Sequence, residues 1–246
     1  MVADFAPELL LHIFRFLPLK SLLAAKAVNR KWNALVPTCR MTPERGELYK
    51  LYHTAITSPK FLDSRQCVLS TIHEFDREAY VAMLEGQDGG GTIGRDRTLP
   101  AEFRCYILEW PQKAVFGHIW PGMDNDFTPT LANKPYGANS LSDTGRISEL
   151  SLFYEKSTSP YPTVCEANVD EFLRNKMDHP AGDVVSVNAL KVWYYGYATH
   201  SWLVVDKERG RLHGSVGVMD QEWGWETDWL VRATSWVQHM KLVLNS

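Results

Sequence analysis

The stretch that decides the N-terminal fold is FAPELLLHIFRFLPLKSLLAAKAVNRKWNALV, residues 5–36. Pro7 suits the first turn of a helix, where its missing N–H costs nothing. Pro18 ends this first helix, since proline cannot continue the hydrogen-bond ladder. A second helix is predicted over residues 21–28, and Asn29 can cap a third. The stretch therefore predicts three short helices in close succession.

These helices carry more apolar surface than they can bury on themselves. In the first helix, apolar residues occupy most of the circumference instead of a single face. They are Leu9, Leu10, Leu11, Ile13, Phe14, Phe16 and Leu17. Modules of about 35 residues usually need a metal, a disulfide or a partner, and the four cysteines form no CxxC pair. Either another protein covers the remaining apolar face, or the helices pack onto the rest of this chain.

The stretch resembles the F-box motif, whose pattern is Leu-Pro-x-Glu, a later Ile, paired leucines, and Val-Cys-x-x-Trp. The matching positions are Glu8, Leu9, Ile13, Leu17, Leu22, Leu23, Val28 and Trp32. Phe5-Ala6 replaces Leu-Pro, Pro7 lies one place later, and Asn29 replaces the usual Cys. The resemblance implies that residues 1–40 bind the Skp-family adaptor of a Skp–cullin–F-box ubiquitin ligase and, through it, a cullin.

The resemblance also implies which residues contact the Skp-family adaptor. They are Phe5, Pro7, Glu8, Leu9, Ile13, Leu17, Leu22, Val28 and Trp32. Most of them are apolar, and buried apolar anchors carry most of the energy of a protein interface.

The rest of the chain predicts an α+β fold, with helices first, then a largely antiparallel sheet and a closing helix. Apolar spacing predicts helices within residues 44–56, 68–75, 76–84, 99–110 and 168–177, and one closing amphipathic helix over 227–244. Asp76 can cap the third of these helices. Short segments rich in β-branched and aromatic residues predict strands at 114–120, 149–155, 190–197, 201–206 and 210–219.

The order of these elements resembles the SUKH superfamily, which includes fungal cell-wall-signalling regulators and bacterial toxin-immunity proteins. LPAEFRCYILEW, residues 99–110, resembles the Leu-Pro…Phe-Leu helix of that superfamily, with Trp110-Pro111 where the family has Asn-Gly-Gly. An F-box joined to such a body is similar to filamentous-fungal F-box proteins. The expected organisation is an F-box (1–40), linking helices (41–85) and an α+β SUKH-like domain (86–246) that recruits a substrate.

Composition excludes several classes of function. The net charge is −3 without a Lys/Arg stripe, so bulk nucleic-acid binding is not expected. No uncharged run is long enough for a membrane helix, and Asp4 and Glu8 interrupt the apolar start, so we expect a cytoplasmic or nuclear protein. The eight histidines include no HxxxH or HExxH pair. We therefore expect no metal, no cofactor and no enzymatic activity.

The leading hypothesis is a substrate-recruiting adaptor subunit of the ligase. The alternatives are a Skp-binding scaffold or signalling module that delivers no substrate, and an uncharacterised enzyme. Trp223 and Trp225, set among carboxylates, form the candidate substrate-binding site, because tryptophans are common interface anchors. Packing under the closing helix is the structural alternative for them. The long polar loop at 121–148 is the competing recruitment site.

Overall fold

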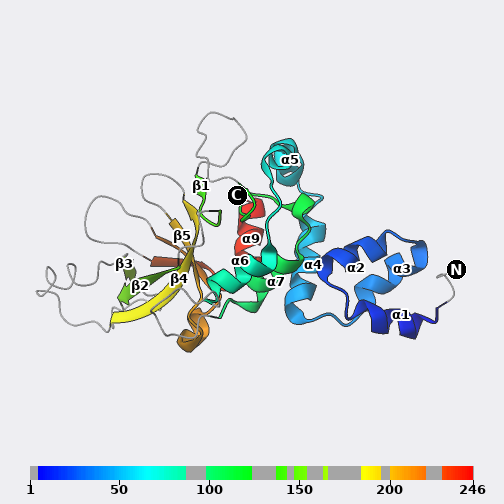
Figure 1. Cartoon of the computed structure of the whole chain (residues 1–246), viewed down its shortest axis with the longest axis horizontal. Coiled ribbons are helices and arrows are strands. Elements are labelled where there is room, and N and C mark those ends of the chain that lie inside the picture. Colours follow the sequence, from blue (N-terminus) through cyan, green and yellow to red (C-terminus); the bar gives the residue numbers. More distant parts are fainter. Residues whose placement is uncertain are drawn as a thin grey trace, which may run out of the picture.

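The computed structural model describes residues 5–86, 98–123, 137–142, 147–153, 163–165, 184–194, 200–219 and 229–245. These parts are arranged along one long axis, with a sheet at one end, a layer of helices in the middle and a three-helix module at the other end (Figure 1). The α+β class expected from the sequence is confirmed.

The N-terminal module contains the three short helices that the sequence predicts. The first helix ends at Phe14, with Arg15 as its C-cap, so Pro18 does not end it as expected. Pro18 is instead the N-cap residue of the second helix, which begins slightly earlier than expected. Asn29 caps the third helix, because its Oδ1 accepts a hydrogen bond from the Trp32 N–H at 2.9 Å. The elements are α1 (Pro7–Phe14), α2 (Leu19–Lys26), α3 (Arg30–Leu35) and the 3-10 turn η1 (Val36–Thr38).

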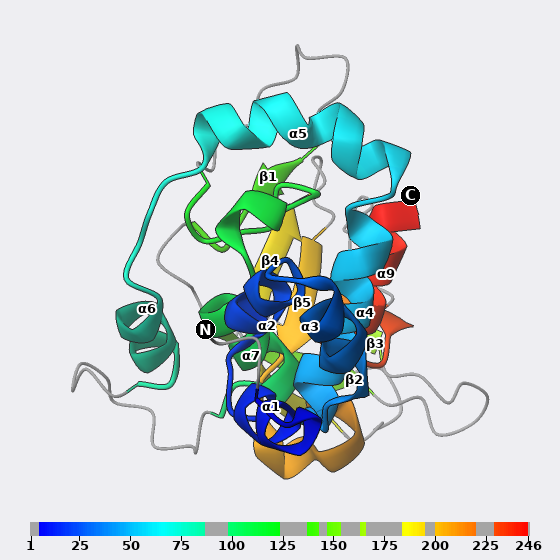
Figure 2. The ribbon, with the colours of Figure 1, turned by 90° about the vertical axis from the view of Figure 1, so that its right-hand side faces the viewer.

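A layer of helices connects this module to the sheet. Its members are α4 (Pro43–Ala55), α5 (Pro59–Thr71), α6 (Arg77–Leu84), α7 (Ala101–Glu109), the 3-10 turn η2 (Gln112–Ala114) and α9 (Trp236–Asn245). Asp76 caps α6 as predicted, with Oδ1 accepting from the Ala79 N–H at 3.0 Å. α4 contacts α2, α7 and α9, so it links the module to the rest of the chain (Figure 2).

The sheet is antiparallel throughout its described pairings and has the order β3-β2-β4-β5-β6-β7, with β1 pairing beside part of β4. Its two edge strands, β3 and β7, approach each other, so the sheet is strongly curved. The strands are β1 (Ala138–Asn139), β2 (Ile147–Phe153), β3 (Thr163–Cys165), β4 (Val184–Tyr194), β5 (His200–Val204), β6 (Val216–Met219) and β7 (Trp229–Ala233).

The strand predicted at residues 114–120 is wrong. This segment is an irregular but buried connection that follows η2. Gly117 and His118 both have positive φ, 65° and 58°, and two successive left-handed residues cannot continue a strand. A Cβ at Gly117 would also collide with Val243 of α9. The aromatic and β-branched composition of this segment therefore reflects its burial and not its pairing in a sheet.

The closing helix predicted over residues 227–244 is wrong in its first part. Trp229–Ala233 is the edge strand β7, paired with β6, and the helix begins only at Trp236. Within β7, Arg232 is exposed between two less exposed neighbours, which is the alternation of a strand. The strand predicted at 210–219 is likewise shorter, because residues 207–212 form a 3-10 turn, η3. The helix predicted at 168–177 lies outside the described residues.

One continuous apolar core runs from α1 to α9. It passes through the helical layer, where large aromatic side chains meet, and reaches the helix-facing side of the sheet. Its centre holds Phe103, Tyr106, Trp110, Trp120 and Trp236, all fully buried. A smaller cluster of Val187, Ala189, Trp202 and Val204 lies on the other side of the sheet. The N-terminal module is therefore joined to the body by packing.

Candidate protein-docking face on the N-terminal helices

Helix α1 has two apolar faces. Leu10 and Phe14 point inward and are fully buried. Phe5, Leu9, Ile13 and Phe16, spaced three or four residues apart, form a second stripe on the outside. Leu9 is 55% exposed and Phe16 is 66% exposed, so the described residues leave this stripe uncovered. A helix that is apolar on both sides has one face to offer to a partner.

Val28, in the turn between α2 and α3, is a fifth exposed apolar side chain of the module, at 59% exposure. We call Phe5, Leu9, Ile13, Phe16 and Val28 together the docking face. Across the part of the chain that the structure describes, eight large apolar side chains are exposed, and five of them belong to the docking face. Exposed apolar residues that occur singly are normal, but five within a stretch this short indicate a binding surface.

Contacts from α3 hold α1 and its preceding residue in place. Lys31 Nζ donates a hydrogen bond to the carbonyl oxygen of Phe5 at 2.7 Å. Beneath the docking face, the ring of Phe14 meets the Trp32 ring edge-on at 5.1 Å between centroids. Since Asn29 caps α3 and thereby positions Trp32, the polar residue that departs from the F-box pattern has a clear structural role.

The structure divides the predicted adaptor-contacting residues into two groups. Those that are exposed are Phe5, Pro7, Glu8, Leu9, Ile13 and Val28. Leu17 and Trp32 are half-buried. Leu22 is fully buried in the core between α2 and its neighbours, where it supports the module. Phe16 was not among the predicted contacts, although its helical spacing from Leu9 and Ile13 places it on the same stripe.

The opposite side of the module is fastened to the body at Glu109, the last residue of α7. One carboxylate oxygen, Oε2, accepts hydrogen bonds from the Leu19 N–H and from Arg45 Nε, both at 2.7 Å. The other oxygen accepts from Arg45 Nη2 at 2.6 Å. Glu109 therefore pairs with α4 through a two-pronged ion pair and also satisfies an unpaired N–H at the start of α2.

The electrostatics of this joint keep Glu109 ionised. Burial alone would raise the pKa of the Glu109 carboxyl, but the hydrogen bonds from Arg45 and the Leu19 N–H outweigh it and lower the pKa. A second polar contact joins the same helices, with Lys26 Nζ 3.1 Å from His53 Nε2. Burial and the nearby Lys26 charge lower the pKa of His53. The joint therefore favours a charged Glu109 and a neutral His53.

The sequence left two interpretations of the apolar surface open: it is covered by another protein, or it packs onto the rest of this chain. Both are partly correct. α2 and the inner side of α1 pack onto the same chain, through the continuous core and the Glu109 joint. The outer side of α1 remains open as the docking face. The module therefore needs the body for one surface and leaves the other available to a partner.

Other candidate sites have less support. Trp223 and Trp225 lie outside the described residues, as does most of the 121–148 loop. Within the described residues, no group of His, Cys, Asp or Glu side chains could hold a metal ion. In that same part of the chain, no helix has the length and apolarity that crossing a membrane requires.

Comparison with known proteins gives a match for the N-terminal module. Residues 7–40 match the F-box-like family, which supports the resemblance found in the sequence. No curated protein and no solved structure matches the chain. The matched segment contains four of the five residues of the docking face and ends just before α4.

Proposed function

We propose that this protein is a substrate-recruiting adaptor subunit of a Skp–cullin–F-box ubiquitin ligase. Its docking face binds the Skp-family adaptor, through which it reaches the cullin, and its body presents a protein substrate. The chain performs no chemistry itself. An adaptor of this kind accelerates ubiquitin transfer by raising the effective concentration of the substrate near a ligase that other subunits complete.

The main support for this proposal is that the segment that matches the family also holds four of the eight large apolar side chains that the described chain leaves exposed. F-box domains generally bind Skp-family adaptors, and the F-box-like segment of this chain is where its exposed apolar residues gather. Leu9 and Ile13 occupy motif positions and are 55% and 46% exposed. Their burial under a partner would remove exposed apolar surface from water, which is favourable.

The substrate-recruiting part of the proposal rests on the body. The large buried aromatic side chains of the core lie in the body, and Glu109 joins the body to the F-box. Such a rigid connection would hold a bound substrate at a fixed position relative to the F-box. Its similarity to the SUKH superfamily stays a prediction, as does recruitment through Trp223 and Trp225. Replacing both tryptophans with alanine should remove partner proteins without lowering the melting temperature. A large fall in melting temperature would instead place them in the core.

The direct test is a double substitution on the docking face. Leu9→Asp with Ile13→Asp should weaken capture of a purified Skp-family adaptor by about 100-fold or more, since buried apolar anchors dominate interface energy. The matched control is Leu62→Asp with Leu69→Asp on α5, which are also exposed, at 60% and 47%, and also share one helix. Both variants should keep the wild-type circular dichroism spectrum. Undiminished capture by the first variant would overturn the proposal.

Delivery of a substrate is tested separately. Proteins captured with the full chain in cells should increase when the proteasome is inhibited and should accumulate when the chain is removed. A scaffold that delivers no substrate would give a capture profile that proteasome inhibition does not change. That result would leave adaptor binding intact and contradict only the recruiting role.

A further inference from the structure

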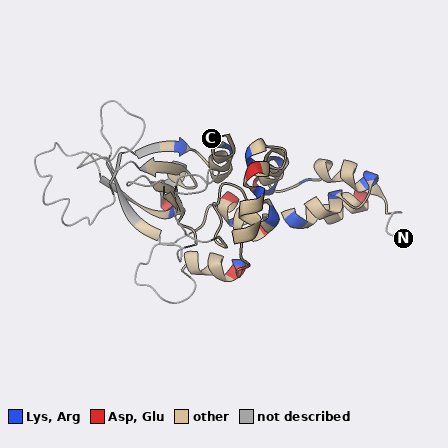
Figure 3. Ribbon diagram, turned by 90° about the horizontal axis from the view of Figure 1, so that it is seen from above, with Lys and Arg blue, Asp and Glu red and all other residues tan. Residues whose placement is uncertain are grey.

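The F-box and the body differ in the sign of their charge. Residues 1–40 contain six Lys/Arg against two Asp/Glu, a net charge of +4, whereas residues 41–246 carry a net charge of −7. Glu8 is the one acidic residue in the described part of the F-box. Figure 3 shows blue segments along the module, whereas the described helices and strands of the body carry blue and red segments side by side. Within the described residues, the excess of positive charge is therefore concentrated in the F-box.

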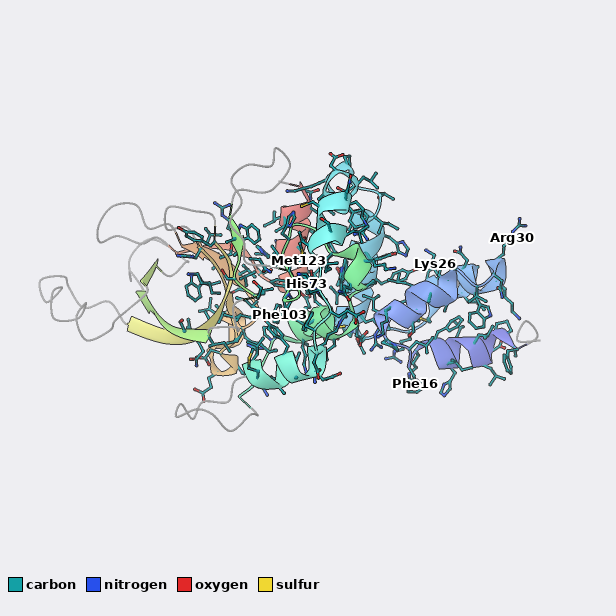
Figure 4. The ribbon with its side chains drawn as sticks, turned by 45° about the horizontal axis from the view of Figure 1, so that its top comes forward. Phe16, Lys26, Arg30, His73, Phe103 and Met123 are labelled. Atoms are coloured by element: carbon teal, nitrogen blue, oxygen red, sulfur yellow. The ribbon has the colours of Figure 1, made fainter. Side chains whose placement is uncertain are left out.

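Three of the six cations of the F-box, Arg15, Arg30 and Lys31, lie near the docking face. The Arg15 guanidinium stands 5.2 Å from the centroid of the Phe16 ring, at one end of the exposed stripe. Lys31, bonded to the Phe5 carbonyl, lies at the other end. Arg30 is exposed at the tip of the module, where it begins α3 (Figure 4). An apolar stripe is thus bordered by positive charge at both ends.

Phe16 extends this stripe beyond the F-box pattern. At 66% exposure it is the most exposed large apolar side chain in the described residues, and it occupies no motif position. The ring of His12 meets it edge-on, with 5.2 Å between ring centroids. Arg15 and His12 therefore contact an aromatic ring that the described residues leave in water.

We propose that the docking face binds an apolar groove whose border carries carboxylates, and that Phe16 is an additional anchor in this groove. This inference rests on the proposed function and specifies the chemistry of the adaptor surface that the F-box meets. Covering the stripe brings Arg15, Arg30 and Lys31 against the rim of the partner, where opposite charges are favoured and like charges are costly.

The rim is tested by making the same change in net charge at two different places on the molecule. Arg15→Glu with Arg30→Glu should slow association with a purified Skp-family adaptor by about ten-fold, because rim charges act mainly on the association rate. Lys113→Glu with Lys207→Glu makes the same change in net charge at two exposed sites of the body and should leave the rate close to wild type. Raising the NaCl concentration from about 50 to 300 mM should slow wild-type association and largely remove the difference between the variants.

The anchor is tested by dissociation. Phe16→Ala should raise the dissociation rate by about ten-fold, as loss of a buried aromatic anchor does. Leu62→Ala on α5, a similarly exposed side chain outside the face, should not change it. Wild-type binding that is insensitive to salt, or charge and Phe16 variants that behave like their controls, would overturn this inference while leaving adaptor binding in place. Failure of the wild-type chain to bind the adaptor at all would overturn the proposed function as well.

Discussion

The F-box and the body use the same kinds of residue for opposite purposes. The body buries its large aromatics almost completely, and Trp110, Trp120, Trp202 and Trp236 are each at most 1% exposed. The F-box leaves Phe5 and Phe16 largely in water. Because burial of one large apolar side chain contributes about 1.5–3 kcal/mol, the body uses that energy to fold, whereas the F-box retains it for association. Aromatic content alone therefore does not indicate which role a segment has.

The largest expected difference between the two regions is in folding stability. Trp236→Ala should lower the free energy of unfolding by about 4 kcal/mol, because it empties a fully buried site against Phe103 and Tyr106. Leu9→Ala should change it by no more than about 0.5 kcal/mol, since that side chain is exposed. Urea unfolding followed by circular dichroism measures both. Comparable losses for the two variants would mean that the docking face belongs to the fold.

The joint between the regions should give the next largest effect. Glu109→Gln should cost about 2–3 kcal/mol, because it leaves the half-buried Arg45 without its charged partner. Glu47→Gln is the control, since its pairs with Lys50 and Lys241 are solvent-exposed and contribute about 0–1 kcal/mol.

Hydrogen exchange distinguishes this joint from a general loss of stability. In Glu109→Gln, the amides at the start of α2 should exchange faster, because Leu19 loses its acceptor. The docking face lies on the other side of the module, so association with the adaptor should be unchanged. A variant with wild-type stability and wild-type exchange would show that apolar packing alone joins the two regions.

Acid should destabilise the body through its buried histidines. Burial and the Arg232 charge lower the pKa of His239 to about 4, and burial and Lys191 do the same for His200. Because the folded pKa lies below that of the unfolded chain, the unfolded state binds more protons. Stability is therefore full above a pH of about 6.5 and is lost below it, by about 2 kcal/mol for each histidine at pH 5.

Substitution of one histidine isolates this effect. The glutamine in His239→Gln cannot take up a proton. When the pH is lowered from 7.5 to 5, the free energy of unfolding should therefore fall in both proteins, but by about 2 kcal/mol less in the variant than in the wild type. Urea titrations at the two pH values provide the measurement. An equal fall in both proteins would exclude His239 as a source of acid sensitivity.

The smallest effects come from a matched pair of helix caps. Asn29→Ala in the F-box and Asp76→Ala in the body each remove one side-chain acceptor from a helix N-terminus and should each cost about 1 kcal/mol. Only Asn29→Ala should also weaken adaptor binding, since α3 carries Lys31 and Trp32 beside the docking face. Equal weakening by both variants would indicate that binding follows overall stability and not local order.

Local signals in the sequence predicted the starts of several helices, although the helix expected at 68–75 lies at Pro59–Thr71. Pro7, Asn29 and Asp76 act on the first turn of a helix, so their effect does not depend on distant partners. The order of helices and antiparallel strands followed from the change in apolar spacing along the chain. The docking face was predicted from the excess of apolar surface on α1 and from the F-box resemblance.

Features that depend on tertiary contacts were not predictable in the same way. Residues 114–120 have a strand-like composition because they are buried, and only the positive φ values at Gly117 and His118 show that they cannot pair. Trp229–Ala233 also fits a helical pattern until its pairing with β6 is known. The Glu109 joint combines residues from three helices that lie far apart in the sequence, so no local pattern reveals it.

The position of Glu109 in the chain has a consequence for protein synthesis. The Leu19 N–H bonds to an acceptor that lies 90 residues later in the chain, which the ribosome adds about 5–20 s afterwards. α9, which packs against α4 and α5, is made later still. During that interval the inner face of α2 and the outer face of α1 are exposed together. The nascent chain is then at its most vulnerable to aggregation, so protection by a chaperone or early capture by the adaptor would matter most before α7 emerges.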